Sequence, residues 1–325
     1  MKKVSVDLFG LHYNLELPWS HWEDNVKLVS GKEVDVHVRY TKKELALVKL
    51  SNLNNLLGIN RMKNITCWKQ DDGYLFLTKG FGSLKVGRNN HVTLHIDQNG
   101  AEWEKIPFLL FYSVALPVVL RSFDYLVLHG NVLAYEDHCI ALIGDSGHGK
   151  STFTAFLMQI FNWNLVSDDL TVLKPIENNF HAYPGAPYIK IKKSESVFRM
   201  LGLDESSMES VSSENIKYFL PCDNNYSSFS EEKKKLTHIF MLLPDNSVEK
   251  IEISELTVKE SISVLSLNIH NMWSIDQSAI ATQMQSIFKL LSSNTKVYMV
   301  KYRQEYETIL LNCTTLHEFI ISNRI

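Results

Sequence analysis

Alternating apolar and polar residues mark the first hundred residues of this chain. Residues 34–40 (VDVHVRY) alternate in part, residues 74–78 follow the turn signal Asp71-Asp72-Gly73, and residues 92–96 alternate strictly. A two-residue period is typical of half-buried strands, and hairpin-sized gaps separate such strands in antiparallel sheets. The pattern therefore predicts a small, mostly antiparallel β domain over residues 1–106.

From Pro107 onward the hydrophobic pattern changes. Residues 108–120 are apolar, too short to span a bilayer and interrupted by Pro117, so we predict a buried helix with a proline kink. Apolar runs of strand length then alternate with helical spacing, which indicates an α/β domain around a central sheet over residues 107–325. The predicted strands are 126–135, 139–143, 165–166, 239–243 and 296–302, and the predicted helices are 153–160, 279–291 and 316–321.

A polar segment interrupts the second domain. Residues 206–235 are rich in Ser and Asn and end in the charge run 231–235 (EEKKK). A loop of this length is either a functional lid or a plain solvated surface, and the charge run by itself favours the surface.

Composition narrows the classes of partner. The 325 residues are 45% hydrophobic, which is ordinary for a globular protein, and their net charge of -3 gives no footprint for nucleic acid or an anionic membrane. Four cysteines, at positions 67, 139, 222 and 313, lie far apart and form no C-x-x-C pair, so neither a zinc site nor a disulfide framework is expected. The first residues contain no apolar signal-peptide region, and we expect a cytoplasmic protein.

The strongest motif is Gly-Asp-Ser-Gly-His-Gly-Lys-Ser at residues 144–151, which fits G-x-x-x-x-G-K-[ST]. With average residue usage, a chain of this length shows the pattern by accident with a probability on the order of one in a hundred. A strand is predicted before it, and the spacing of Phe153, Phe156, Leu157 and Ile160 predicts a helix after it. The alternative, a Gly-rich turn with an exposed lysine, explains this context less well, so we predict a nucleotide site.

The chemistry of that loop suits ATP and Mg²⁺. Successive N–H groups of a glycine-lined loop converge on phosphate oxygens, and the following helix adds its positive N-terminal end. Lys150 is expected to reach the β- and γ-phosphates, and the Ser151 hydroxyl to ligate Mg²⁺. The residues predicted to bind the nucleotide are Gly144, Asp145, Ser146, Gly147, His148, Gly149, Lys150, Ser151 and Thr152.

Two adjacent carboxylates, Asp168 and Asp169, follow the apolar residues 165–166. In an open α/β sheet the carboxyl ends of the strands face the ligand crevice, and neighbouring residues on a strand point to opposite sides. One carboxylate could therefore accept the proton of an attacking hydroxyl while the other holds Mg²⁺. An Asp-Asp turn or helix cap is the alternative, and His129 in its apolar run could equally be a satisfied core residue.

Together, Leu128-His129-Gly130, the glycine-rich motif and residues 165–169 (LVSDD) resemble the catalytic domain of HPr kinase/phosphorylases. The set resembles still more the HPr-kinase-related kinases of lasso-peptide and other peptide-modification gene clusters. Phe9-Gly10-Leu11, residues 35–39 (DVHVR) and residues 183–187 (YPGAP) match as well. The Glu-Ile-Arg-Gly segment of HPr kinases proper does not occur, which leaves HPr as substrate and the reverse phosphorolysis open.

The resemblance implies a P-loop kinase fold shared with phosphoenolpyruvate carboxykinases. It implies that Asp168 is the catalytic base, that Asp169 lies with Ser151 at the metal, and that His129 and Lys150 lie beside the transferring phosphoryl group. Lys217 matches the position of the family's basic loop. Relatives in lasso-peptide clusters phosphorylate a serine of a precursor peptide, so the expected partner is a peptide or protein with an acceptor serine. HPr kinases form hexamers, and a homo-oligomer stays open here.

Other functions remain as alternatives. A small-molecule kinase, acting on free serine or a sugar, needs the same loop, and so does a non-catalytic module that senses ATP. Transporter ATPases and GTPases need an LSGGQ-like or an N-K-x-D string, and neither occurs in the chain. The leading interpretation is a kinase acting on a seryl or related hydroxyl, because positioning and charge neutralisation supply most of the catalysis in phosphoryl transfer.

Overall fold

The computed structural model describes residues 2–17, 31, 33–41, 56–60, 62–79, 82–96, 106–205, 208–210, 217–222 and 228–322. The chain forms two compact units, Met1–Tyr125 with His270–Gln283, and Leu126–Ile269 with Met284–Ile325. The predicted domain boundary at residue 106 stays a prediction, but by packing the apolar helix after Pro107 belongs to the first unit.

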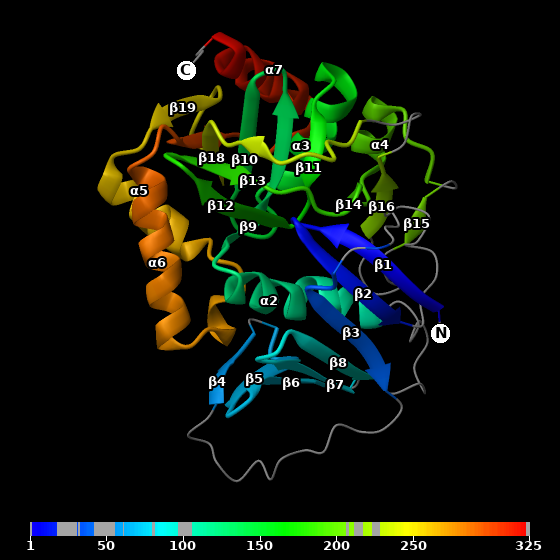
Figure 1. Ribbon diagram of the computed structural model, residues 1–325. Helices are drawn as coiled ribbons and strands as arrows, with labels where there is room; N and C mark the ends of the chain where they lie inside the picture. Colours follow the sequence, from blue (N-terminus) through cyan, green and yellow to red (C-terminus); the bar gives the residue numbers. More distant parts are fainter. Residues whose placement is uncertain are drawn as a thin grey trace. The chain divides into compact units, whose positions relative to one another are not determined.

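The first unit contains an 8-stranded sheet in the order β1-β2-β3-β8-β7-β6-β5-β4 (Figure 1). Neighbours pair antiparallel except for β2 with β3 and β3 with β8, which confirms a mostly antiparallel sheet. The three strands predicted here are confirmed as β3, β6 and β8. The strands are β1 (Lys2–Leu8), β2 (Leu11–Leu17), β3 (Val36–Thr41), β4 (Leu56–Ile59), β5 (Ile65–Gln70), β6 (Gly73–Thr78), β7 (Gly82–Gly87) and β8 (His91–Ile96).

The predicted apolar helix forms in three parts: α1 (Ile106–Leu110), the π-helical segment η3 (Phe111–Ala115) and α2 (Leu116–Ser122). Pro117 lies in the first turn of α2 but follows helical residues, so its missing N–H leaves the preceding turn without one intrahelical donor. The Ser113 carbonyl oxygen, four residues before Pro117, accepts a hydrogen bond from the Asn271 side-chain amide at 2.7 Å instead. The irregularity therefore falls before the proline, in the π-helical segment. Phe111 packs on Tyr13 with ring centroids 5.9 Å apart, which buries the helix in the core of the first unit.

The second unit is built on a 9-stranded mixed sheet in the order β17-β13-β12-β9-β10-β18-β20-β19, with β11 also paired to β9. Among the strand pairs of this sheet that the structure describes, β10–β18 and β18–β20 are parallel and the others antiparallel. A 3-stranded sheet, β14-β16-β15, lies in the same unit. The strands are β9 (Leu126–Tyr135), β10 (His138–Ile143), β11 (Asn164–Ser167), β12 (Leu170–Ile176), β13 (Asn179–Ala182), β14 (Tyr188–Lys192), β15 (Glu209–Ser210), β16 (Lys217–Pro221), β17 (Lys234–Lys235), β18 (His238–Pro244), β19 (Glu252–Glu255) and β20 (Lys296–Tyr302).

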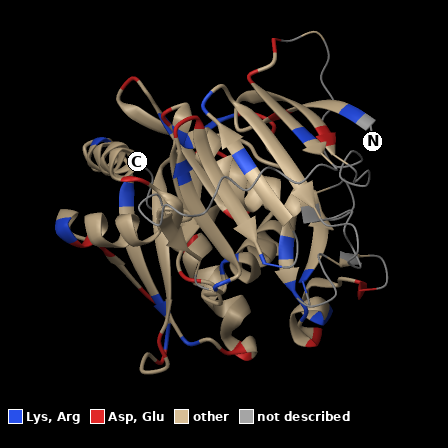
Figure 2. Cartoon of the chain, turned by 90° about the horizontal axis from the view of Figure 1, so that it is seen from below, with Lys and Arg blue, Asp and Glu red and all other residues tan. Residues whose placement is uncertain are grey.

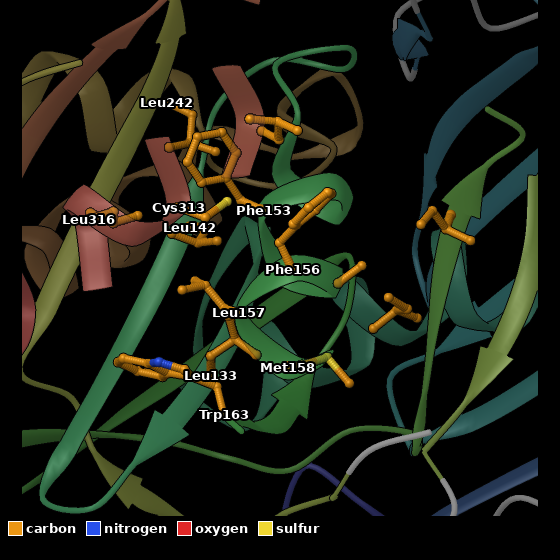
Figure 3. Packing of buried hydrophobic residues seen from close by; sticks show 14 of the residues in the cluster. Leu133, Leu142, Phe153, Phe156, Leu157, Met158, Trp163, Leu242, Cys313 and Leu316 are labelled. Atoms are coloured by element: carbon orange, nitrogen blue, oxygen red, sulfur yellow. The ribbon is translucent and has the colours of Figure 1, made fainter. Parts of the chain in front are cut away.

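The core of the second unit forms between α3 and the sheet. Figure 3 shows Phe153, Phe156 and Leu157 of α3 pointing into a cluster that also contains Leu142 of β10 and Leu316 of α7. Ile160, predicted on the same apolar face, is exposed near the end of the helix. The remaining helices are α3 (Lys150–Phe161), α4 (Glu195–Leu201), α5 (Val258–Leu267), η5 (Met272–Ser274), α6 (Gln277–Leu291) and α7 (Tyr306–Ser322).

Several predicted elements differ in extent. The short strand at 165–166 is β11, but β12 follows after only Asp168 and Asp169, so the two aspartates connect two strands and do not end an isolated one. The final helix begins at Tyr306, well before the predicted 316. The polar segment 206–235 contains β15, β16 and β17, while its residues 206–207, 211–216 and 223–227 lie outside the described residues.

Charged residues (Figure 2) and cysteines are spread over the elements of the chain. Figure 2 shows basic and acidic residues interspersed along the elements of the chain. All four cysteines are free, and Cys67, Cys139 and Cys313 are buried, as expected for inert thiols. Within the described part of the chain, no helix is both long and apolar enough to cross a bilayer.

Candidate functional site

The glycine-rich motif forms the connection between β10 and α3, as the hydrophobic pattern predicts. Gly144 has a φ of 143° and Gly149 a φ of 67°, both in the region that favours glycine. A Cβ on Gly144 would lie 2.9 Å from the Leu242 carbonyl oxygen, and one on Gly149 would lie 2.6 Å from the Tyr302 hydroxyl. The close approach of β18 and β20 therefore leaves no room for side chains at these two positions.

Hydrogen bonds hold the loop in place from outside. The ring nitrogen Nδ1 of His148 lies 2.9 Å from the Leu242 carbonyl oxygen, and Gln304 Nε2 donates to the Gly147 carbonyl at 2.7 Å. His148 therefore fastens the loop to β18. His148 occupies a position of the motif that can be any residue, so the motif alone does not reveal this structural role.

Lys150 is the first residue of α3 and is buried. Its ammonium donates to the carbonyl oxygens of Gly144 at 2.7 Å and Asp145 at 3.0 Å, so it lies across its own loop. Burial lowers the pKa of Lys150 below its usual value, while the charges of Asp169 and Asp168 oppose that shift. The two carboxylates are thus close enough to Lys150 to interact electrostatically with it.

Asp168 is buried, with an exposed fraction of 1%. Its Oδ2 accepts a hydrogen bond from the Lys190 backbone N–H at 2.9 Å, and its Oδ1 has no partner among the described residues. Burial, followed by the negative charge of Asp169, raises the pKa of Asp168 to about 7. A carboxyl with this pKa is poised to exchange a proton near neutral pH.

Asp169 differs from its neighbour in exposure and charge. Its backbone is left-handed, with a φ of 64°, and its side chain is 26% exposed and forms an ion pair with the Lys190 ammonium. Burial by itself raises the pKa of Asp169, but the charge of Lys190 outweighs burial and holds the pKa well below its usual range. While it is paired with Lys190, Asp169 is therefore anionic at neutral pH, which suits cation binding better than proton exchange.

His129 lies on β9, and its Nδ1 is 3.3 Å from the Asp169 carbonyl oxygen. Burial, followed by the charge of Lys150, lowers the pKa of His129 to about 4. The imidazole is therefore neutral at pH 7, and it can donate or accept a hydrogen bond without carrying charge.

A cavity of about 670 Å³ within the second unit brings many of the predicted residues together. Asp168 is absent from its wall, as are Gly144, Asp145 and His148. The predicted residues that line the cavity are His129, Ser146, Gly147, Gly149, Lys150, Ser151, Thr152 and Asp169. Lys217, which matched only by position, lines it too.

Lys190 and Asn131 are among the residues of this site to which the sequence pattern did not point. Lys190 pairs with Asp169, and Asn131 accepts the Asp169 N–H at 3.1 Å while donating to the Thr154 hydroxyl at 3.0 Å. Each interrupts an apolar strand with a polar side chain, Asn131 on β9 and Lys190 on β14, and that interruption is the available signal. The interruption does not reveal which residues these side chains contact, because the contacts join strands that are far apart in sequence.

The donor atoms fit a magnesium ion. Ser151 offers a hydroxyl oxygen and Asp169 a carboxylate on the same cavity wall, and Mg²⁺ prefers oxygen ligands. The described residues contain no group of three or more His, Cys, Asp or Glu placed to hold a metal. Mg²⁺ sites in kinases commonly use one or two carboxylates together with phosphate oxygens and waters, so this sparse donor set suits it.

No family model matches the sequence. No curated protein matches it either. Among solved structures the chain is similar to the HPr(Ser) kinase/phosphatase from Coxiella burnetii, with 12% identity, a TM-score of 0.31, and coverage of 61% of this chain and 99% of that chain. At this TM-score the likeness does not bear on the function of the chain, and no comparison supports a link to lasso-peptide clusters.

Proposed function

We propose that the protein is an ATP-dependent phosphotransferase that moves the γ-phosphoryl group to a serine-type hydroxyl of a protein or peptide. One observation supports this most directly: Lys150, Ser151 and Asp169 line a single cavity whose wall includes the glycine loop before α3. That combination offers a glycine loop suited to anions, a lysine ammonium and a carboxylate suited to a metal within one pocket.

The loop binds the triphosphate in this proposal. Backbone N–H groups of residues 144–151 and the N-terminal end of the 12-residue helix α3 attract phosphate oxygens. The Lys150 ammonium exchanges its loop carbonyl partners for the β- and γ-phosphates, which are stronger acceptors because they are charged. Ser151 and Asp169 would hold Mg²⁺, which when bound neutralises negative charge on the transferring phosphoryl group.

Proton removal from the acceptor is assigned to the acidic pair. The raised pKa and unpartnered Oδ1 of Asp168 make it the better base, and Asp169 stays charged beside the metal. Asp168 is buried and does not line the cavity, so the proposal includes a separation of Asp169 from Lys190 that admits the acceptor hydroxyl to Asp168. Lys190, released from Asp169, then stabilises charge on the phosphoryl group, and neutral His129 donates a hydrogen bond to it.

A second function has one observation in its favour. The burial of Asp168 behind Asp169 suits a module that binds ATP without transferring phosphate, since such a module needs the loop but no accessible base. The two functions differ in what happens to the γ-phosphate and share the requirement for Lys150.

The deciding experiment incubates purified protein with γ-labelled ATP, Mg²⁺ and extract of the source cells, followed by mass spectrometry of labelled species. A phosphotransferase labels a peptide, protein or small molecule, and Asp168→Asn abolishes the label while nucleotide binding persists. If the unaltered chain and the Asp168→Asn variant both bind ATP and neither labels an acceptor, the non-catalytic module is favoured. If the label appears on a free metabolite, the protein is still a kinase, but its acceptor is a small molecule and not a peptide or protein.

A further inference from the structure

The first unit contains a cavity of its own, with a volume of about 310 Å³. Its walls come from β5, β6 and β7, from the end of α2, and from residues 274–279. The volume lies at the lower end of the range for small-molecule sites, so it suits a ligand of metabolite size or the end of a chain.

A buried cation faces this cavity. Arg121, in the last turn of α2, lines the cavity and has an exposed fraction of only 9%. Its Nη1 donates to the His270 carbonyl oxygen at 2.8 Å, and the guanidinium carries further N–H donors beyond that one. Throughout the described residues, no carboxylate forms an ion pair with Arg121.

The carboxylate of the cavity wall is already occupied by other donors. Asp276 Oδ2 accepts hydrogen bonds from Lys69 Nζ at 2.5 Å and from the Tyr74 hydroxyl at 3.1 Å. Its Oδ1 accepts from the Ser278 hydroxyl at 2.7 Å and from the Ala279 N–H at 2.9 Å. Asp276 therefore fixes the start of α6 and binds Lys69, and it leaves Arg121 without a counter-charge in contact.

A buried guanidinium without an anion in direct contact is costly even with the charge of Asp276 on the same cavity wall, and an anion in the cavity would offset that cost. Burial lowers the pKa of Arg121 to about 10, so the group still carries its charge at pH 7. The planar fork of an arginine matches a carboxylate through two parallel hydrogen bonds. Apolar wall residues, among them Val118, Val119 and Ile275, would contact the body of a ligand held this way.

We propose that this cavity binds a carboxylate ligand, with Arg121 as the anion-recognising residue. The carboxylate belongs either to a small organic acid or to the C-terminus of a peptide, because both present the same planar anion on an apolar body. This site is separate in residues and in chemistry from the cavity that contains Lys150, and its existence does not depend on phosphotransfer.

The test uses the full chain and fluorine NMR. We expect 4-fluorobenzoate to bind and its neutral isostere 4-fluorobenzamide not to bind, because only the first carries the anion. The dipeptide N-acetyl-Ala-Phe tests for recognition of a peptide C-terminus. If the form with a free C-terminus displaces the fluorinated probe and the C-terminal amide does not, the site accepts a peptide carboxylate. Inorganic phosphate is the third competitor, and tighter binding of phosphate than of either acid would overturn the carboxylate assignment.

Variants separate recognition from folding. Arg121→Met should weaken 4-fluorobenzoate binding by about tenfold to a hundredfold, the loss typical of a charged hydrogen-bonded partner, and Arg121→Lys should lie between. Ala279→Leu keeps the guanidinium but fills part of the cavity, so it should also weaken binding in a chain whose charge is unchanged. Lys85→Met, which removes an exposed ion pair with Asp72 on the same sheet, is the matched control.

Failure of both acids to bind the natively folded chain would overturn the proposal. So would binding that survives both Arg121→Met and Ala279→Leu, since the ligand would then lie elsewhere. If Arg121→Met unfolds the protein, Ala279→Leu alone decides, because loss of binding supports the site and retention removes it.

Discussion

The side-chain carbonyl of Asn131 accepts a hydrogen bond from the backbone N–H of Asp169 at 3.1 Å. Asn131 is completely buried on β9, and its amide nitrogen is fixed in turn by Thr154 of α3. The bond holds Asp169 in a left-handed conformation that residues other than glycine rarely adopt. One buried amide therefore joins the central strand, the helix after the glycine loop and the acidic pair.

Replacing Asn131 by alanine should affect both stability and chemistry. The change leaves the Asp169 N–H and the Thr154 hydroxyl without this partner, at a cost of about 1–3 kcal/mol in unfolding free energy. Phosphate transfer should fall further than stability explains, because Asp169 is released from its strained backbone. Urea denaturation and transfer assays measure the two effects, with Asn164→Ala on β11 as the control. If Asn131→Ala lowers the free energy of unfolding but leaves the rate of phosphate transfer unchanged, Asn131 contributes only to folding.

Lys150→Ala should weaken nucleotide binding while leaving the fold intact. The ammonium is expected to contact the β- and γ-phosphates, and the loss of one charged hydrogen-bonding partner weakens binding by about tenfold to a hundredfold. Titration with a fluorescent ATP analogue measures the change. Lys289→Ala, at an exposed position of α6, removes the same charge and is the control. Equal affinity of the two variants would mean that the loop does not bind phosphate through this lysine.

The pH dependence of turnover should report the acidic pair. A base is active when deprotonated, and the Asp168 pKa of about 7 predicts that turnover rises with pH through neutrality. Asp168→Asn should remove this rise and lower turnover by about a hundredfold or more. Asp169→Asn should shift the rise toward lower pH, because the negative charge of Asp169 contributes to the raised pKa of Asp168. A pH profile that is the same in all three proteins would contradict the assignment.

Gly149→Ala should disrupt the loop for two separable reasons. The new Cβ would lie 2.6 Å from the Tyr302 hydroxyl, and the φ of 67° disfavours any side chain. Tyr302→Phe removes that hydroxyl, which is buried without a partner among the described residues, so alone it should be neutral or slightly stabilising. The double variant should recover the steric part of the lost nucleotide affinity but not the backbone part. Recovery to the full affinity would mean that the left-handed conformation contributes nothing.

The local elements of this protein are readable from its sequence. The alternation in residues 34–40 and 92–96 predicts strands that the structure contains, since a half-buried strand must place every second side chain in the core. Continuous apolar runs predict β20 and the strand before the glycine loop, and helical spacing of apolar residues predicts the helix after it. The order of strands in the sheets is not readable in this way, because it depends on pairings between distant segments.

The candidate site also has features that follow from local sequence and features that depend on contacts between distant segments. The sequence by itself determined the glycine-rich loop, Lys150, Ser151 and the presence of two carboxylates, because these residue types follow from local backbone and phosphate chemistry. Only the tertiary structure decided that Asp169 faces the cavity while Asp168 lies behind it, and that Lys190 and Asn131 hold the pair. The physical reason is that burial and charge pairing are set by strands β9, β12 and β14, which meet only when the chain is folded.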